Sequence, residues 1–130
     1  LDAARGILSK GGVWVIYPEG TRSPDGRLYR GRTGIMRVAL SVPDAAVVPV
    51  GIRGTREIDR PGHRGWRRGR TEVHLGEPLD LSPWRHQADS PEAWREAADA
   101  LMAAIQKLSG QEYVDRHATA DERRRRDETP

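Results

Sequence analysis

The sequence has 130 residues, a formal net charge of +3, 36% hydrophobic residues and 32% charged residues. These values are typical of one small globular domain or part of one, and the longest apolar run, Val13–Tyr17, is far too short to cross a bilayer. Because cysteine is absent, the sequence excludes disulfides, thiolate nucleophiles and sulfur-ligated metals.

The positive charge is concentrated in two segments. Residues 22–37 contain five arginines and one acid, a net charge of +4, and residues 53–70 contain seven arginines and two acids, a net charge of +5. Residues 77–99, by contrast, contain six acids and two arginines, a net charge of −4. A local basic surface favours an anionic partner: a phosphate ester, a nucleic acid or an anionic membrane.

The first elements are a helix and a strand. Leu1, Ala4 and Leu8 have helical spacing, and the glycines at 11 and 12 end the predicted helix. The chain does not begin with methionine, so we expect further sequence upstream. The β-branched and aromatic run Val13–Tyr17 then predicts a strand buried on both faces, as in a parallel sheet.

A turn, a helix and a second strand follow. Ser-Pro-Asp-Gly at residues 23–26 is a turn signal, and Thr33 is expected to cap a helix that ends before Pro43. The next strand is predicted at Val47–Ile52, with Pro49 as its unusual member. Strand, helix and strand form a right-handed βαβ unit, which predicts an α/β fold with a mostly parallel sheet.

A further strand is predicted at Thr71–Leu75. Alternation suggests that Glu72 and His74 point outward, while Val73 and Leu75 point inward.

The clearest helix starts after Ser90 and ends before Gly110. Its apolar stripe, which we expect to pack into the core, consists of Trp94, Ala97, Ala98, Leu101, Met102, Ile105 and Leu108. The sequence from His117 onward is charged and almost free of apolar residues. We therefore expect residues 1–115 to form the domain and residues 116–130 to form a disordered tail. The sequence contains no internal repeat.

The loop after Val13–Tyr17 is the best candidate for a binding site, because ligands in open α/β sheets bind beyond the carboxyl ends of strands. Gly20 allows a close or left-handed backbone, Thr21 offers a hydroxyl, and Arg22 offers a planar fork for phosphate oxygens. Arg32, near a predicted helix start, offers a second cation. Composition alone also allows a hydrated surface turn in which Glu19 pairs with an arginine.

Three stretches in this order resemble the third and fourth motif blocks of the glycerophospholipid acyltransferase family. They are YPEGTRS at residues 17–23, GRTGIMRVAL at 31–40 and AVVPVGIRGT at 46–55. The resemblance is strong over residues 11–55 and weak through VHLGEPLDL at 73–81. It implies part of an α/β acyltransferase domain without its N-terminal portion.

The resemblance also implies an activity. A fatty acyl group would pass from acyl-CoA or acyl carrier protein to the hydroxyl of a lysophosphatidic acid, without a cofactor. Pro49 would shape the acyl-donor side. The residues implied near the acceptor phosphate are Glu19, Gly20, Thr21, Arg22 and Arg32.

The catalytic block of that family is absent from this sequence. The family uses a His-x-x-x-x-Asp pair in which the histidine takes the hydroxyl proton and the aspartate orients it. None of the four histidines, His63, His74, His86 and His117, has an aspartate five residues later. We therefore predict no catalytic residue in this chain, expect the base upstream, and expect the chain alone to be inactive.

The other candidates have weaker functional interpretations. We expect His74 on a solvated face, no metal site, and no base near Ser23. The segment 63–70, with Trp66, is either a hydrated loop or a contact with an anionic membrane surface.

The expected partners are a lysophospholipid, an acyl donor and the inner face of a membrane, with a cytoplasmic, peripheral location and no nucleic acid. The alternative is a non-enzymatic basic module that binds nucleic acid or anionic membrane through Arg53–Arg70. The lack of aromatic residues beyond Trp66 in that segment weakens the alternative.

Overall fold

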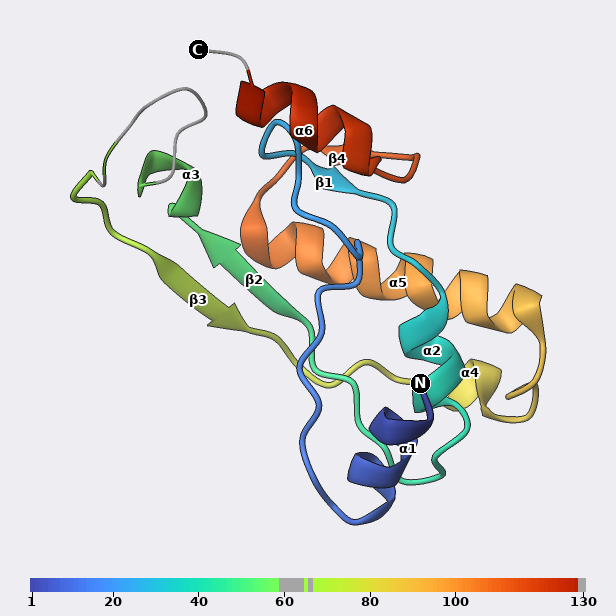
Figure 1. Ribbon diagram of the computed structural model, residues 1–130. Helices are drawn as coiled ribbons and strands as arrows, with labels where there is room; N and C mark the ends of the chain where they lie inside the picture. Colours follow the sequence, from blue (N-terminus) through green and yellow to red (C-terminus); the bar gives the residue numbers. More distant parts are fainter. Residues whose placement is uncertain (59–64, 66, 129–130) are drawn as a thin grey trace.

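The computed structural model describes residues 1–58, 65 and 67–128, which form helices and two small sheets (Figure 1). This combination confirms the predicted α/β class. The elements in chain order are α1 (Asp2–Ser9), β1 (Leu28–Tyr29), α2 (Gly34–Ala39), β2 (Val50–Arg53), α3 (Thr55–Ile58), β3 (Glu72–Leu75), α4 (Ser82–Arg85), α5 (Pro91–Ser109), β4 (Tyr113–Val114) and α6 (Ala120–Glu128).

Each sheet contains two strands. β1 and β4 are parallel, with Leu28 opposite Tyr113, and this pair joins segments that are more than 80 residues apart. β2 and β3 are antiparallel, with Val50 opposite Leu75. β2 begins after Pro49, because proline has no N–H to donate to a strand ladder.

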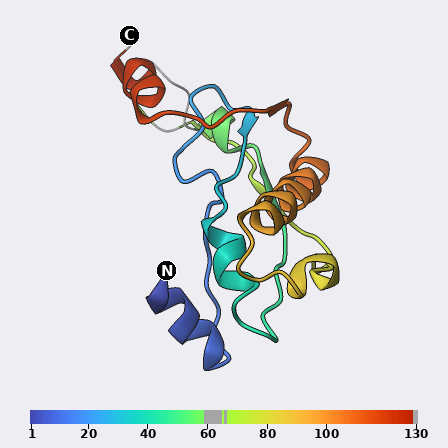
Figure 2. The ribbon, with the colours of Figure 1, turned by 90° about the vertical axis from the view of Figure 1, so that its right-hand side faces the viewer.

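Helix α5 organises the core, as the sequence predicts. The Ser90 side chain accepts a hydrogen bond from the Ala93 N–H at 3.3 Å, and Gly110 ends the helix in the left-handed conformation with φ 70°. The helix packs against α2 and β2 (Figure 2). The main buried cluster consists of Leu28, Met36, Ala39, Leu40, Val47, Leu81, Ala97, Ala98, Leu101, Met102 and Ile105.

The prediction of a buried strand at Val13–Tyr17 is wrong. The segment lies outside both sheets, and the side chains of Val13 and Val15 are 84% and 82% exposed. A parallel strand needs neighbouring strands and a layer on each face. Among the residues that the structure describes, no strand pairs with this segment. The predicted βαβ unit is therefore not formed.

The orientation of β3 is also the reverse of the prediction. Val73 and Leu75 are 65% and 74% exposed, while His74 pairs with Gly51 on the face that meets α5. A Cβ added to Gly51 would lie 2.5 Å from Leu108 Cβ, so the helix packs directly on this glycine. The glycine thus decides which face of the hairpin α5 covers, and the more apolar face is left at the surface.

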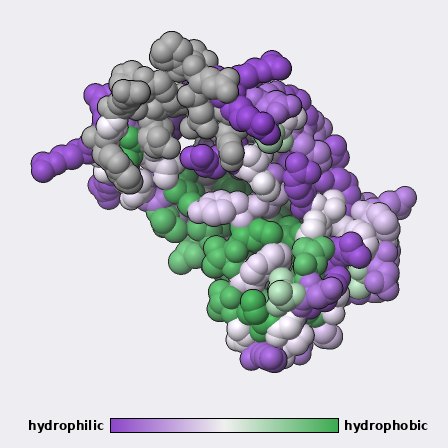
Figure 3. All heavy atoms as spheres, in the orientation of Figure 1, coloured by the Kyte–Doolittle hydropathy of each residue, from purple (hydrophilic) through white to green (hydrophobic). Residues whose placement is uncertain are grey.

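Part of the molecular surface is apolar. Figure 3 shows a hydrophobic band across the face seen in Figure 1, between hydrophilic regions. The most exposed large apolar residues are Leu1, Val13, Val15, Tyr17, Val73 and Leu75. In the described part of the chain, no helix has the length and apolar character needed to cross a membrane.

The two ends of the chain form helices at opposite ends of the molecule, α1 and α6, as Figures 1 and 2 both show. α6 occupies part of the segment that was expected to be a disordered tail. The Glu122 carboxylate accepts hydrogen bonds from the Thr119 N–H and hydroxyl, and it pairs with Arg116 at 2.8 Å. These local bonds supply the start of a helix for which the apolar pattern gives no signal.

Candidate functional site

The loop between Val13–Tyr17 and α2 begins with a tight turn. The Gly20 N–H donates to the Tyr17 carbonyl at 3.1 Å, and Gly20 has φ 72°, in the left-handed region that favours glycine. A Cβ at position 20 would lie 2.9 Å from both Cδ and Nε of Arg32. The Arg32 side chain therefore lies across the Gly20 backbone.

Two hydrogen bonds hold the first half of this loop against the second half. The Arg32 N–H donates to the Pro18 carbonyl at 2.8 Å. The Tyr29 N–H donates to Glu19 Oε2 at 2.9 Å. Burial raises the pKa of the half-buried Glu19 carboxyl, although the bond from Tyr29 acts in the opposite direction. The motif residues thus lie beside β1.

A second set of bonds fixes the bend at residues 23–27. The Ser23 hydroxyl donates to the Arg27 carbonyl at 2.7 Å and accepts from the Gly26 N–H at 2.9 Å. Asp25 accepts from Arg27 Nε at 2.7 Å and from the Tyr29 hydroxyl at 3.0 Å. Burial acts to raise the pKa of Asp25, but these bonds outweigh it and leave the pKa lowered. Ser23 is therefore a turn residue held by local bonds.

The segment before α6 closes the loop from the other side, which the sequence did not predict. The Leu28 N–H donates to the Glu112 carbonyl at 2.9 Å, and the Arg30 N–H donates to the Arg116 carbonyl at 3.0 Å. The Arg116 guanidinium also lies 5.2 Å from the centroid of the Tyr29 ring. A two-residue strand such as β4 is too short to show a periodic pattern, so no sequence signal identifies these contacts.

The four arginines of the loop fall into two classes. Arg27 pairs with Asp25 at 2.7 Å, and Arg30 lies 3.7 Å from Asp115. Arg22 and Arg32 are exposed, and neither forms a side-chain hydrogen bond or ion pair with another residue in the described ranges. Within the described part of the chain, two guanidinium groups of this loop therefore have no protein partner that would compete with an external anion.

Two further residues of the predicted site, Thr21 and Pro49, lie in different parts of the structure. Thr21 lies in the loop between Gly20 and Arg22 and is half-buried. Pro49 is buried directly before β2, and its carbonyl accepts the Gly76 N–H at 2.9 Å. Pro49 is therefore part of the β2–β3 region rather than of the loop.

The histidines have ordinary partners. His74 Nε2 lies 2.9 Å from Glu72 Oε2, and His86 Nε2 lies 2.8 Å from Gln87 Nε2. His117 Nδ1 lies 3.0 Å from the Arg30 carbonyl, which places this histidine beside the loop despite its distance in sequence.

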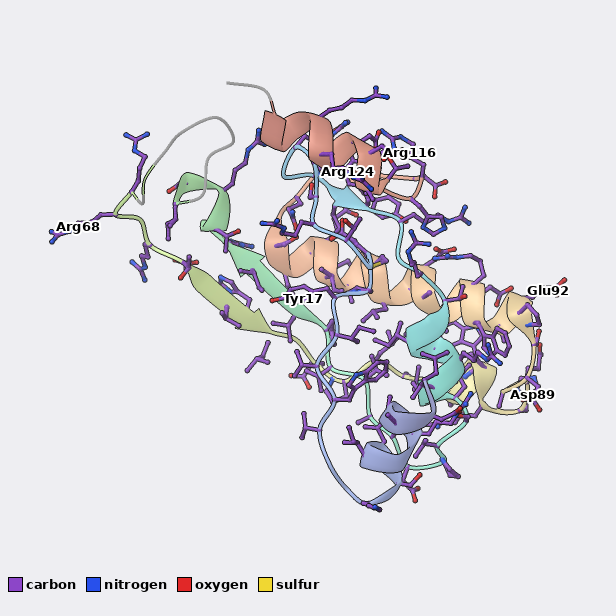
Figure 4. The ribbon with its side chains drawn as sticks, in the orientation of Figure 1. Tyr17, Arg68, Asp89, Glu92, Arg116 and Arg124 are labelled. Atoms are coloured by element: carbon purple, nitrogen blue, oxygen red, sulfur yellow. The ribbon has the colours of Figure 1, made fainter. Side chains whose placement is uncertain are left out.

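The predicted membrane contact was assigned to the segment 63–70, of which His63, Arg64 and Trp66 lie outside the described residues. Arg68 is described and exposed, and Figure 4 shows it projecting from the body on the side away from Arg116. Within the described residues, no group of three or more His, Asp or Glu side chains is arranged to hold a metal ion.

The comparisons with known proteins match the part of the chain that contains this loop. Residues 1–53 match the family model described as Acyltransferase. The chain is 38% identical over 74 residues to the chloroplastic 1-acyl-sn-glycerol-3-phosphate acyltransferase LPAT1 of Arabidopsis thaliana. The aligned stretch covers 56% of this chain and 20% of that protein. No solved structure matches the chain.

Two further relatives have the same printed function. A 1-acyl-sn-glycerol-3-phosphate acyltransferase of Limnanthes alba is 36% identical over 72 residues, 55% of this chain and 23% of the relative. One of Cocos nucifera is 33% identical over 72 residues, 55% of this chain and 21% of the relative. The chain thus spans about a fifth of the length of the curated relatives that it matches. The family resemblance found in the sequence is confirmed.

Proposed function

We propose that this chain, which matches the Acyltransferase family model over residues 1–53, is the acceptor-binding part of an enzyme that acylates lysophosphatidic acid. The observation that carries the proposal is a pair of exposed arginines without a side-chain partner among the described residues: Arg32, which lies across Gly20, and Arg22, two residues after Gly20 in the same loop. A phosphate monoester presents several oxygens, and guanidinium groups bind such oxygens in bidentate geometry.

Each residue of the loop has a distinct role in binding the acceptor. Arg22 and Arg32 bind the phosphate, Gly20 leaves room for the Arg32 side chain, and Thr21 lies between the two cations in the turn. Glu19 belongs to the same site through its contact with β1. Holding the phosphate fixes the acceptor hydroxyl relative to the acyl donor, which is the part of catalysis that positioning supplies.

The reaction that fits this site is acyl transfer from a thioester. The acceptor hydroxyl oxygen bonds to the acyl carbon, the carbon–sulfur bond breaks, and the thiol carrier leaves. The donor is acyl-CoA or acyl carrier protein, and Pro49 contributes to the donor side. A histidine from outside these 130 residues takes the hydroxyl proton and an aspartate orients that histidine, so this chain alone transfers no acyl group.

The lipid acceptor places this chemistry at a membrane surface, which we propose to be the cytoplasmic face. The match to the Acyltransferase family model and to the acyltransferase relatives favours this function over a non-enzymatic basic module acting through Arg53–Arg70. The arginines in the described part of that segment, such as Arg68, then serve at most as a general attraction for anionic surfaces.

The test replaces Arg22 by lysine in the complete enzyme, with Arg68→Lys as the matched control. Lysine keeps the charge and loses the bidentate fork, so Arg22→Lys should lower kcat/KM for lysophosphatidic acid about 10- to 100-fold. The loss should shrink for a monoacylglycerol acceptor, because that acceptor lacks the phosphate. Arg68→Lys should change neither value. An equal loss for both acceptors, or no loss, would show that Arg22 does not bind the phosphate.

A further inference from the structure

Glu19 is an acid inside a loop that otherwise offers cations. Its carboxylate is half-buried, and Oε2 accepts the Tyr29 N–H at 2.9 Å. Tyr29 itself is 1% exposed, so its amide cannot exchange this bond for one to bulk water without movement of the backbone. The carboxylate therefore satisfies a buried donor of β1.

This bond also joins the residue before Gly20 to the strand that precedes Arg32. Tyr29 and Arg32 are three residues apart, and the Arg32 N–H is bonded to the Pro18 carbonyl at 2.8 Å. The bonds at Pro18 and Glu19 together align residues 18–19 with residues 29–32. The Arg32 side chain then crosses Gly20, the residue that follows Glu19. Loss of the Glu19 bond would leave the bond from the Arg32 N–H to the Pro18 carbonyl as the remaining backbone link between residues 18–19 and residues 29–32 in the described part of the chain, although the Gly31 carbonyl would still accept from Arg95 at 2.8 Å.

A direct role for Glu19 at the phosphate is electrostatically unfavourable. A carboxylate next to a phosphate dianion repels it, and the repulsion grows as the site loses water. The Tyr29 amide, by contrast, is a neutral donor that a carboxylate binds strongly.

We infer that Glu19 is a positioning residue of the acceptor site: its carboxylate holds the Tyr29 amide, thereby places Arg32 at the Gly20 turn, and does not itself bind the phosphate. The inference rests on the proposed function, because it assigns a role within the same phosphate site. Removing a negative charge next to a phosphate site would ordinarily strengthen phosphate binding, whereas this inference predicts that removing the Glu19 carboxylate weakens it.

The first test measures binding of inorganic phosphate and of glycerol 3-phosphate to the 130-residue chain by calorimetry. Glu19→Ala removes a negative charge and yet should weaken both ligands by a similar factor, about tenfold, because Arg32 loses its place. Glu19→Gln keeps an oxygen acceptor for the Tyr29 N–H and should restore affinity to within about threefold of the original.

Glu112→Ala is the matched control. Its carboxylate is 73% exposed and pairs with Arg27 at 3.4 Å, while its backbone carbonyl, which accepts the Leu28 N–H, is kept. This substitution also removes one negative charge beside the loop and should leave phosphate affinity unchanged or slightly raised.

Three results would overturn the inference. Tighter or unchanged phosphate binding by Glu19→Ala would show that the carboxylate acts only through its charge. A loss confined to glycerol 3-phosphate would show that Glu19 contacts the glycerol hydroxyls directly. Equal weakness of the Gln and Ala variants would show that hydrogen bonding to Tyr29 is not the cause.

A second readout separates this inference from the proposed function. Hydrogen exchange of the Tyr29 amide, measured without ligand, should be about tenfold faster in Glu19→Ala and near the original rate in Glu19→Gln. Unchanged exchange in Glu19→Ala would refute the positioning role whatever the ligand data show. If the unsubstituted chain binds neither phosphate probe while Tyr29 exchange responds as expected, the phosphate site is wrong and the Glu19–Tyr29 contact stands.

Discussion

Replacing Gly20 by alanine should damage phosphate binding more than it damages the fold. Gly20 has φ 72°, and a Cβ there would lie 2.9 Å from Cδ and Nε of Arg32. The alanine therefore has two effects: it strains the backbone, and it pushes away the side chain that lies across the turn. Because the displaced atoms belong to a flexible side chain, the clash is relieved by moving Arg32 rather than the backbone.

The magnitudes follow from these two effects. An L-residue in the left-handed region costs about 1–2 kcal/mol of stability. Losing one guanidinium contact to a phosphate costs about 1.5–3 kcal/mol of binding free energy, the scale of a hydrogen bond to a charged group. Gly20→Ala should thus lower the affinity for glycerol 3-phosphate about 10- to 100-fold.

Two other glycines provide matched controls. Gly11 has φ 75° with nothing within 4 Å of an added Cβ, so Gly11→Ala introduces the strain alone. Gly26 has φ 88°, and its Cβ would displace Arg56 instead of Arg32. Thermal unfolding should show similar losses for all three variants, and calorimetry should show a loss of affinity for Gly20→Ala alone. If Gly20→Ala binds the ligand as Gly11→Ala does, Arg32 is not a phosphate ligand.

Three further predictions concern the fold. Arg85→Ala should lower the free energy of unfolding by about 2–4 kcal/mol, because its guanidinium donates to three backbone carbonyls, at the last residue of α2 and in the segment after it, at 2.6–3.2 Å. A loss below about 1 kcal/mol in denaturant titration would contradict this. Val13→Ser should change stability by less than about 0.5 kcal/mol, whereas Met36→Ala should cost about 2–5 kcal/mol, and a large loss at Val13 would contradict its exposed placement. The hydrogen bond from Arg116 lowers the pKa of Glu122 to about 2, so its stabilising effect on α6 is complete above pH 4.5 and disappears as the pH falls through 2. Hydrogen exchange in α6 should accelerate over that range, and Glu122→Gln should abolish the pH dependence; the same pH response in that variant would refute the assignment.

The sequence predicts elements whose signals are local. In α5, a serine cap, a helical apolar stripe and a terminal glycine all indicate the same helix, and the structure forms it at Pro91–Ser109. The turn at residues 23–26 and the helix after Thr33 are likewise found, although among the described residues Thr33 makes no side-chain capping bond. These elements depend mainly on their own residues, so their pattern is sufficient.

The sequence fails where the environment of a segment is set by distant residues. Val13–Tyr17 has the composition of a central strand, but composition does not supply the neighbouring strands that such a position requires. In β3 the apolar alternation gives the two faces of the strand, but it does not say which face a helix covers. That choice depends on Gly51, which lies on another strand and admits α5 by its lack of a side chain.

In the candidate site, too, some features are set by local sequence and others by residues that are distant in the chain. The sequence favours Arg22 and Arg32 by their places in the loop and by the family resemblance, but it does not show which of the four loop arginines pair with acids of the chain. The structure separates them by where the acids lie: Asp25 neutralises one nearby arginine, while Arg30 lies beside an acid 85 residues further along the chain. The parallel β1–β4 pair is what brings that distant acid to the loop. The phosphate specificity proposed for residues 19–32 therefore depends on a segment beyond the matched region 1–53, because this segment determines which cations remain available.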